Sequence, residues 1–291
     1  MKKSLLLSLI LSLLLTSFTV IASPILVPAW QTEAIFQNPE SVVYDAKRNR
    51  LYVSNVNGNG MVVDGNGYIS TLSLEGKLLE LHWLDGLNAP KGMAIVDDIL
   101  YVADINQVLA VDLAKQVIIQ RYPAPNAAFL NDVAAGEDGS IYISDMITNT
   151  IYRIKEGQIS SWLVDPQLES PNGLLVEGDQ LIVATWGNMT DGLNTAIPGQ
   201  LKTVSLTTKQ IKSMGDGTSM GNLDGLESDG NGDYFVTDWV AGKLLFISSQ
   251  ALVSTLIVLE KGSADHTVLL KQKLIIIPMM LSDKIVAYYI K

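Results

Sequence analysis

Short apolar runs recur in pairs along the chain after residue 22, and a few turn-forming residues join the two runs of each pair. The second runs cover residues 51–55, 100–104, 141–145, 181–185, 234–238 and 274–278. Gly, Asp and Asn between paired runs of β-branched and aromatic residues are typical of tight β-hairpins. Because the runs are nearly continuous in hydrophobicity, we expect strands that are covered on both faces. The pattern predicts an all-β protein with no long helix.

A polar residue introduces the first run of each pair, and we call these six positions the lead residues. They are Glu40, Lys91, Asn131, Asn172, Asp224 and Asp265, with steps of 51, 40, 41, 52 and 41 residues between them. Repeats of about 40–50 residues that each hold several strands indicate a propeller. The sequence therefore predicts a six-bladed β-propeller with four-stranded antiparallel blades.

The last repeat is short of one strand, which suggests how the ring closes. After residue 278 only one further strand, 285–290, precedes the end of the chain at Lys291. We expect the missing strand to come from the N-terminal side, around residues 33–36. Pairing the two ends in one blade removes an open sheet edge. Residues 23–291 are thus predicted to form a single propeller domain.

Residues 1–22 have the layout of an export signal. Lys2 and Lys3 form a basic start, residues 5–15 an apolar core, and residues 20–22 a cleavage site. The apolar run is shorter than the roughly 20 residues of a spanning helix, although an uncleaved anchor is the alternative. The chain has no cysteine, so disulfides and thiol chemistry are excluded. We expect a bacterial periplasmic or secreted protein.

The charge balance narrows the class of partner. The chain has 20 Lys and Arg against 30 Asp and Glu, and loss of Lys2 and Lys3 would leave 18 − 30 = −12. Nucleic acids and anionic membranes require clustered basic residues. We therefore expect no nucleic-acid partner and no membrane association after signal removal. A small-molecule substrate or ligand and a monomeric protein remain as the expectation.

One polar residue per blade, at the same point of each inner strand, would converge on the axis. Glu40, Asn131, Asn172 and Asp224 would then bring two carboxylates and two amide oxygens together. Two unneutralised carboxylates about 4–5 Å apart would repel by roughly 3–4 kcal/mol at an effective dielectric constant near 20. A hard cation, most plausibly Ca²⁺, would relieve this repulsion, and zinc is disfavoured because the chain has two His. The alternative is a polar tunnel of hydrogen-bonded Asn and water.

Several further residues should border the same mouth, because the second strand of each blade returns to it. These are Asn55, Asp104, Asp145, Trp186 and Asp238. The three Asp residues would form a second metal shell or contact the substrate, or alternatively cap turns. His266 would lie near the mouth and shuttle a proton, or be a structural histidine. Lys91 would balance the central carboxylates or point to water. The segment 186–199 would arch over the mouth as a lid with an apolar wall from Trp186, Met189, Leu193 and Ile197, or simply decorate blade four.

Four short motifs at these positions resemble a known family. They are Asn38-Pro39-Glu40, Leu130-Asn131-Asp132, Ser170-Pro171-Asn172-Gly173-Leu174 and Leu223-Asp224-Gly225-Leu226. In this order and spacing they resemble the senescence-marker-protein/gluconolactonase/luciferin-regenerating-enzyme family, which includes regucalcin, and more distantly the paraoxonases and diisopropylfluorophosphatase.

The resemblance implies a divalent metal at the axis and the hydrolysis of lactones or related esters. It implies that Glu40, Asn172 and Asp224 are metal ligands, and that Asn131 is a fourth ligand or a substrate contact. In this interpretation the metal polarises the substrate carbonyl, while Asp224 activates water or attacks directly.

One departure from the family pattern bears on the substrate. Sugar-lactone hydrolases of this family often have Arg-Phe-Asn-Asp around the third-blade Asn, and the Arg holds the sugar. This chain has Phe129 at the Arg position, which favours a more apolar ester or lactone. Lys91, Phe129, Asn131 and Trp186 are the candidate substrate contacts. The leading hypothesis is an exported, calcium-dependent lactonase or esterase with Asp224 and His266 as catalytic residues. Its rivals are a non-catalytic propeller that binds a ligand or protein, and a propeller whose metal only stiffens the ring.

Overall fold

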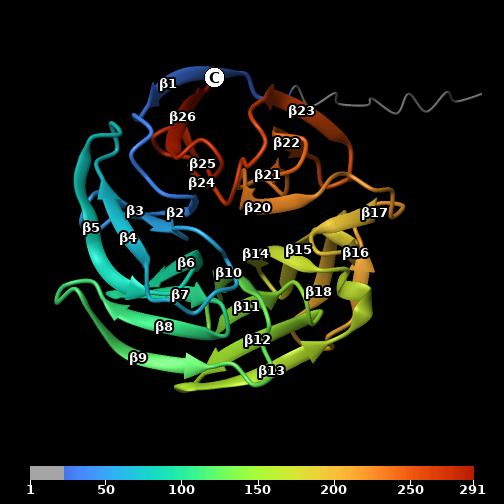
Figure 1. Ribbon diagram of the computed structural model, residues 1–291. Helices are drawn as coiled ribbons and strands as arrows, with labels where there is room; N and C mark the ends of the chain where they lie inside the picture. The colour runs from blue at the N-terminus through green and yellow to red at the C-terminus, as the bar shows by residue number, and fades with distance from the viewer. Residues whose placement is uncertain (1–22) are drawn as a thin grey trace, which may run out of the picture.

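Within residues 23–291, six four-stranded antiparallel sheets stand around one central axis, and one strand of each sheet lies nearest the axis (Figure 1). This computed structural model describes residues 23–291, so the predicted leader, residues 1–22, lies outside the described part. The all-β class, the blade count and the four strands per blade predicted from the sequence are confirmed. Within residues 23–291, no helix combines the length and hydrophobicity required to span a membrane.

The blades follow one another along the chain. Blade one consists of β2 (Pro39–Asp45), β3 (Arg50–Asn55), β4 (Gly67–Leu72) and β5 (Leu78–Leu87). Blade two consists of β6 (Pro90–Val96), β7 (Ile99–Asp104), β8 (Gln107–Asp112) and β9 (Val117–Pro123). Blade three consists of β10 (Leu130–Ala135), β11 (Ile141–Asp145), β12 (Thr150–Lys155) and β13 (Gln158–Val164), and a short 3₁₀ helix, η1 (Pro166–Leu168), follows it.

The second half of the ring differs by one insertion. Blade four consists of β14 (Pro171–Glu177), β15 (Gln180–Thr185), β18 (Leu201–Ser205) and β19 (Ile211–Ser213). A separate hairpin of β16 (Gly187–Asp191) and β17 (Asn194–Pro198) interrupts it, and we call this the rim hairpin. Blade five consists of β20 (Leu223–Ser228), β21 (Tyr234–Asp238), β22 (Lys243–Ile247) and β23 (Val253–Val258). Blade six consists of β24 (Thr267–Leu269), β25 (Leu274–Met279), β26 (Lys284–Ile290) and β1 (Leu26–Gln31).

The two ends of the chain close the ring as predicted, but with a different N-terminal segment. β1 pairs antiparallel with β26, from Leu26 opposite Ile290 to Gln31 opposite Val286 (Figure 1). The expected segment, residues 33–36, instead links β1 to blade one. Phe36 in this link is buried between blades six and one, against Ile276 and Ile285 among others. The apolar character of the link therefore reflects packing between blades and not strand pairing.

A β-bulge places each lead residue of blades one to five at the axis. The pairing of the first two strands slips at the lead position, for example between Pro39 and Ser41 and between Leu130 and Val133. The same slip occurs in blades two, four and five. A bulge bends its strand and re-aims a side chain. Here it turns the lead side chains toward the centre of the ring.

Blade six departs from the sequence alignment by one residue. The bridge between Ser263 and Met279 corresponds to the pair Leu223 and Asp238 of blade five. Ala264 therefore occupies the sixth lead position, and the assignment of Asp265 to it was wrong. Asp265 corresponds instead to Gly225, one residue further along the inner strand. The error arose because the true lead position carries no polar side chain.

Glycine after the lead residue lets adjacent inner strands approach closely. A Cβ on Gly173 would lie 2.1 Å from the carbonyl oxygen of Asp224, and one on Gly225 would lie 2.7 Å from Nδ1 of His266. No side chain fits at such distances without displacing a backbone. The Asn-Gly-Leu and Asp-Gly-Leu motifs therefore serve the crowding of strands at the axis as well as the site.

Candidate metal and substrate site

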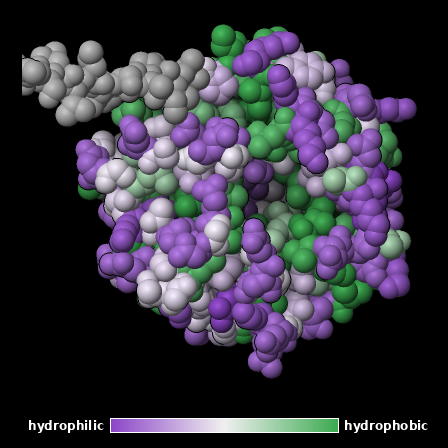
Figure 2. Space-filling view, turned by 180° about the vertical axis from the view of Figure 1, so that it is seen from behind, coloured by the Kyte–Doolittle hydropathy of each residue, from purple (hydrophilic) through white to green (hydrophobic). Residues whose placement is uncertain are grey.

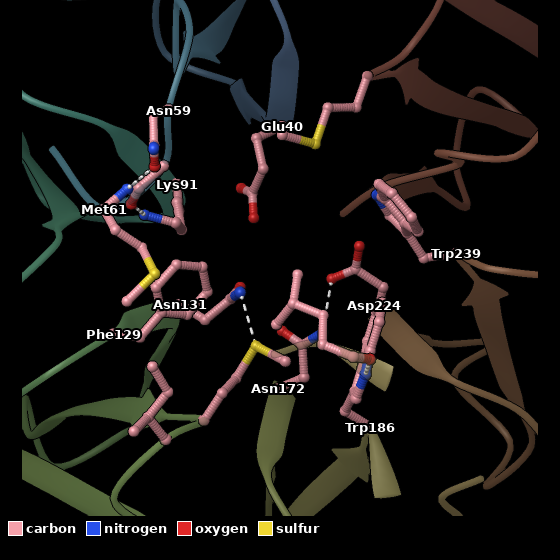
Figure 3. Close-up of a pocket in the computed structure, with 15 residues that line it drawn as sticks. Glu40, Asn59, Met61, Lys91, Phe129, Asn131, Asn172, Trp186, Asp224 and Trp239 are labelled. Atoms are coloured by element: carbon pink, nitrogen blue, oxygen red, sulfur yellow. Dashed lines mark hydrogen bonds between the residues drawn. The ribbon is translucent and has the colours of Figure 1, made fainter. Parts of the chain in front are cut away.

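The side chains at the lead positions meet in a cavity of about 220 Å³ on the axis, which we call the central cavity. Glu40, Lys91, Asn131, Asn172 and Asp224 come from five successive inner strands and point into it (Figure 3). The structure thus brings together all four predicted metal ligands. The predicted substrate contacts Phe129 and Trp186 line the same cavity.

Two buried carboxyl groups form the polar floor of the central cavity. Glu40 and Asp224 are each 4 % exposed. Burial, and then the neighbouring Asp224 and Asp265, raises the pKa of Glu40 well above its usual range. Burial and the charge of Asp265 likewise raise the pKa of Asp224. Removal from water disfavours the ionised form of both groups, so a cation is the natural means of keeping them charged at neutral pH.

Two unpaired oxygen atoms on this floor fit such a cation. Oε2 of Glu40 and Oδ1 of Asn172 are buried and have no hydrogen-bond partner among residues 23–291. The amide nitrogen of Asn172 donates to Oδ1 of Asp224 at 2.9 Å, so these two side chains are already adjacent. Buried polar atoms are normally paired, and an unpaired one calls for an explanation. Carboxylate and amide oxygens are ligands that Ca²⁺ prefers.

Only two of the candidate metal ligands are carboxylates, however. Among residues 23–291, no three His, Cys, Asp or Glu side chains cluster in a way that could hold a metal. The donor set is two carboxylates and amide oxygens, so it fits a hard cation that completes its shell with water, and it does not fit zinc.

Lys91 is the one cationic side chain that lines the central cavity among the described residues. Its ammonium group donates to the carbonyl oxygens of Ala89 at 3.0 Å and Gly60 at 3.1 Å, and it lies 4.5 Å from the centre of the Phe129 ring. Burial lowers the pKa of Lys91 to about 8, and Glu40 opposes this change. An ammonium group has three donors, so one remains for a ligand.

An apolar ring stands above the polar floor. Met146, Trp186, Trp239 and Met280 line the cavity, and each directly follows the second strand of its blade. Phe129, Met146 and Trp186 pack together, with Met189 of the rim hairpin and Trp239 against them. Asn131 reaches into this wall, where its amide nitrogen lies 3.0 Å from Sδ of Met146. The cavity thus offers polar chemistry at its floor and apolar contact at its sides.

His266 does not lie in the central cavity. It lines a second cavity of about 210 Å³, together with Asp132, Glu227, Asp265 and apolar residues of the inner strands. The prediction of His266 at the mouth was wrong because it rested on the one-residue misalignment of blade six. Burial lowers the pKa of His266 to about 3, and neither ring nitrogen has a hydrogen-bond partner in the described part of the chain. Figure 2, seen from behind Figure 1, shows a hollow near the middle of the disc bordered by both hydrophilic and hydrophobic residues.

The carboxylates at the ends of the second strands cap turns, which was the alternative reading. Asp104 accepts the backbone N–H groups of Asn88 and Ala89. Asp145 accepts those of Ala128, Ile147 and Thr148. None of Asn55, Asp104, Asp145 and Asp238 lines the central cavity. In blades three to six the residue that follows the second strand lines the cavity instead, namely Met146, Trp186, Trp239 and Met280.

Several residues of the site were not predicted from the sequence. Asn59, Gly60 and Met61, in the loop between β3 and β4, line the cavity, as do Met146, Ile147, Trp239 and Met280. Two of them could have been predicted, since Met146 and Trp239 occupy the same place in their repeats as Trp186. Of the predicted lid residues, Trp186 and Leu193 line the cavity and Met189 packs behind Trp186, whereas Ile197 is 56 % exposed.

This arrangement of site and fold agrees with the comparison of the chain with protein families. Residues 38–260 match the SMP-30/Gluconolactonase/LRE-like region. The chain belongs to the SMP-30/gluconolactonase/LRE-like family. The match begins just before Glu40 and ends before blade six, so it includes five lead residues of this family member. No curated protein matches the chain in sequence.

Solved structures show the same fold at low sequence identity. A gluconolactonase from Xanthomonas campestris aligns with a TM-score of 0.69 at 14% identity, covering 92% of this chain and 95% of that one. A catalytically inactive virginiamycin B lyase from Staphylococcus aureus, solved with quinupristin, aligns with a TM-score of 0.61 at 15% identity, covering 89% and 98%. A streptogramin B lyase aligns with a TM-score of 0.63 at 13% identity, covering 90% and 98%.

Proposed function

We propose that this protein is an exported, divalent-metal-dependent hydrolase of lactones or esters with an apolar substituent, and that its metal is Ca²⁺. The observation that carries the proposal is the pair of buried carboxyl groups, Glu40 and Asp224, beside unpaired ligand oxygens at the floor of an apolar cavity. Family membership supports hydrolysis of this type. The apolar walls, and Phe129 in place of a sugar-binding Arg, favour an apolar substrate.

Each residue then has a defined task. Glu40, Asn172, Asp224 and Asn131 would hold the cation, which would supply a Lewis acid for the substrate carbonyl. Asp224 accepts a proton from the attacking water while the oxygen of that water bonds to the carbonyl carbon. The same proton passes to the leaving oxygen when the ester bond breaks.

Lys91 and the apolar ring position the substrate. The free N–H donor of Lys91 would bond to the carbonyl oxygen as it gains negative charge, a form of electrostatic stabilisation that acts strongly in a dry site. Trp186 and Phe129 would exclude water around the acyl chain. His266 takes no part in this scheme because it lies in the second cavity.

The first test is calorimetric titration of Ca²⁺ into chelator-stripped protein, followed by a screen of alkyl lactones, aryl esters and gluconolactone. We expect Glu40→Gln and Asp224→Asn to lose Ca²⁺ binding. Asp224→Asn should also lower kcat about 10²–10⁴-fold, as expected for a lost general base. Asp179→Asn, at an exposed turn, is the matched control and should behave as wild type. Hydrolysis by Asp224→Asn at the wild-type rate would exclude this mechanism.

One observation favours a second candidate, a propeller that binds a ligand without turnover. Asn172 and Asn131 direct their amide N–H groups to Asp224 and Met146, which a hydrogen-bonded site without a metal would also do. In that case calorimetry would show no Ca²⁺ binding, and chelator would leave the melting temperature unchanged. The export signal, the periplasmic or secreted location and the monomeric state belong to the same proposal. N-terminal sequencing of protein from a periplasmic extract, and its mass by light scattering, would test them.

A further inference from the structure

A third cavity opens beside the central one and shares a wall with it. Its volume is about 350 Å³, and we call it the side cavity. Trp186, Leu193 and Trp239 line both cavities, so the two are neighbours across a thin aromatic partition. In Figure 3 both tryptophans stand on the Asp224 side of the central cavity. A ligand in the central cavity that reached beyond these rings would therefore meet the side cavity.

The partition is held by specific contacts. The two indole rings lie 5.8 Å apart between centroids at 55°, and Nε1 of Trp186 donates to the carbonyl oxygen of Leu193 at 2.9 Å. The buried side chain of Asn222 donates to the Trp186 carbonyl oxygen at 2.8 Å and to Oγ1 of Thr195 at 2.9 Å. These bonds tie the rim hairpin to blade five. The side cavity is thus a built feature between two blades, with aromatic surface on its inner side.

Among the described residues, one cationic side chain lines the side cavity. Lys261 lines it, and its ammonium group lies 5.4 Å from the centre of the Trp239 ring. The N–H of the next residue, Gly262, donates to the carbonyl oxygen of Trp239 at 2.8 Å, which fixes this segment against the ring. Within residues 23–291, Lys261 forms no ion pair with a carboxylate.

Lys261 selects one orientation of a ligand that has a charged end. Its ammonium group attracts a negative group to the side cavity, whereas the charges of Glu40, Asp224 and Lys91 in the central cavity would be engaged by the cation and the substrate carbonyl. A ligand with an apolar arm and an anionic end would place its anion at Lys261 and its arm along the tryptophans. Its neutral end would then reach the central cavity. Aromatic rings beside a lysine suit such an amphipathic chain, because they cover the arm and leave the head group paired.

We propose that the side cavity is a subsite for the anionic end of the substrate, whose ester or lactone carbonyl lies in the central cavity. The substrate class is thereby an ester or lactone with an apolar chain that ends in a carboxylate. This inference rests on the proposed function. Lys261 is its specificity-determining residue, and it has no role in bond cleavage.

The test uses two esters that differ only at the far end of the acyl chain. The mono-4-nitrophenyl ester of suberic acid carries a terminal carboxylate, and 4-nitrophenyl octanoate carries a methyl group there. Lys261→Gln should lower kcat/KM for the suberate ester about fivefold, through KM, because an exposed ion pair contributes up to about 1 kcal/mol. Octanoate hydrolysis should not change. Lys261→Arg should keep the preference, and Lys271→Gln, at an exposed lysine outside the cavity, is the control.

A binding measurement separates this inference from the proposed function. Suberanilic acid, an anilide with the same chain and carboxylate, would be titrated while the tryptophan fluorescence of the protein, to which Trp186 and Trp239 contribute, is followed. We expect about fivefold weaker binding to Lys261→Gln. Hydrolysis of both esters with no dependence on Lys261 would overturn the subsite alone. Failure to hydrolyse either ester, with suberanilic acid still bound through Lys261, would overturn the hydrolase alone. Equal binding to both proteins, or no binding, would also overturn the subsite.

Discussion

The pH dependence of stability would measure the free-energy cost of burying the ionised carboxyl group of Glu227 at the second cavity. Burial, and then the charge of Asp265, raises the pKa of Glu227 from its ordinary 4.5 to about 8. The folded protein therefore binds one proton more than the unfolded chain between about pH 4.5 and pH 8. Below pH 4.5 the burial of Glu227 does not lower the free energy of unfolding. As the pH rises from about 4.5 to about 8, the free energy of unfolding falls. Replacing Glu227 by Gln removes the charge and should remove this loss.

The size of the effect follows from the pKa difference. A change from 4.5 to about 8 corresponds to an upper limit of about 5 kcal/mol at 1.36 kcal/mol per pH unit. Glu227 faces the second cavity and is only half-buried by surface area, so water screens part of this cost. We expect Glu227→Gln to raise the free energy of unfolding by about 2–4 kcal/mol at pH 9 and by almost nothing at pH 4. For a chain of this size that is about 4–7 °C in Tm at pH 9.

Urea unfolding of chelator-stripped protein at pH 4, 7 and 9 would measure this difference. Glu137→Gln, at an exposed turn, is the control and should keep the wild-type pH dependence. The reasoning is refuted if wild type and Glu227→Gln lose stability in parallel between pH 4 and pH 9. A stabilisation of equal size at all three pH values would also refute it, because it would then not depend on ionisation.

Two further predictions concern the axis. Gly173→Ala should lower the free energy of unfolding by about 3 kcal/mol or more, because its Cβ would lie 2.1 Å from the Asp224 carbonyl oxygen; wild-type stability in urea would mean that the inner strands are less crowded than described. Ca²⁺ should raise Tm at pH 8 much more than at pH 5, because the raised pKa of Glu40 leaves this ligand protonated in acid. Equal shifts in Tm at both pH values, measured by calorimetry, would place the bound cation away from the buried carboxyl groups.

The repeat pattern was enough to predict the architecture because it depends on local properties. Strand residues, hairpin turns and the spacing of about 40–50 residues are visible in a single sequence. The lead positions of blades one to five followed from the same spacing. Convergence of Glu40, Asn131, Asn172 and Asp224 then needed only the symmetry of a closed ring, and the structure places these four side chains in one cavity.

Register and enclosure could not be predicted, because they arise from contacts between distant segments. A shift of one residue along a strand turns every side chain to the other face, and the pairing of Ser263 with Met279 alone decided that Ala264 occupies the sixth lead position. That single shift moved His266 from the predicted mouth to the second cavity.

The sequence by itself determined the six-bladed ring and the polar residues at its centre, since both are encoded in residue type and spacing. Tertiary structure alone decided which apolar side chains enclose that centre. The side cavity is lined by Trp186 and Lys261, which are 75 positions apart in the chain (261 − 186). No local sequence pattern predicts that two such distant residues line one cavity. The strand that closes the ring was likewise decided by tertiary pairing, since β1 and not the segment 33–36 lies against β26.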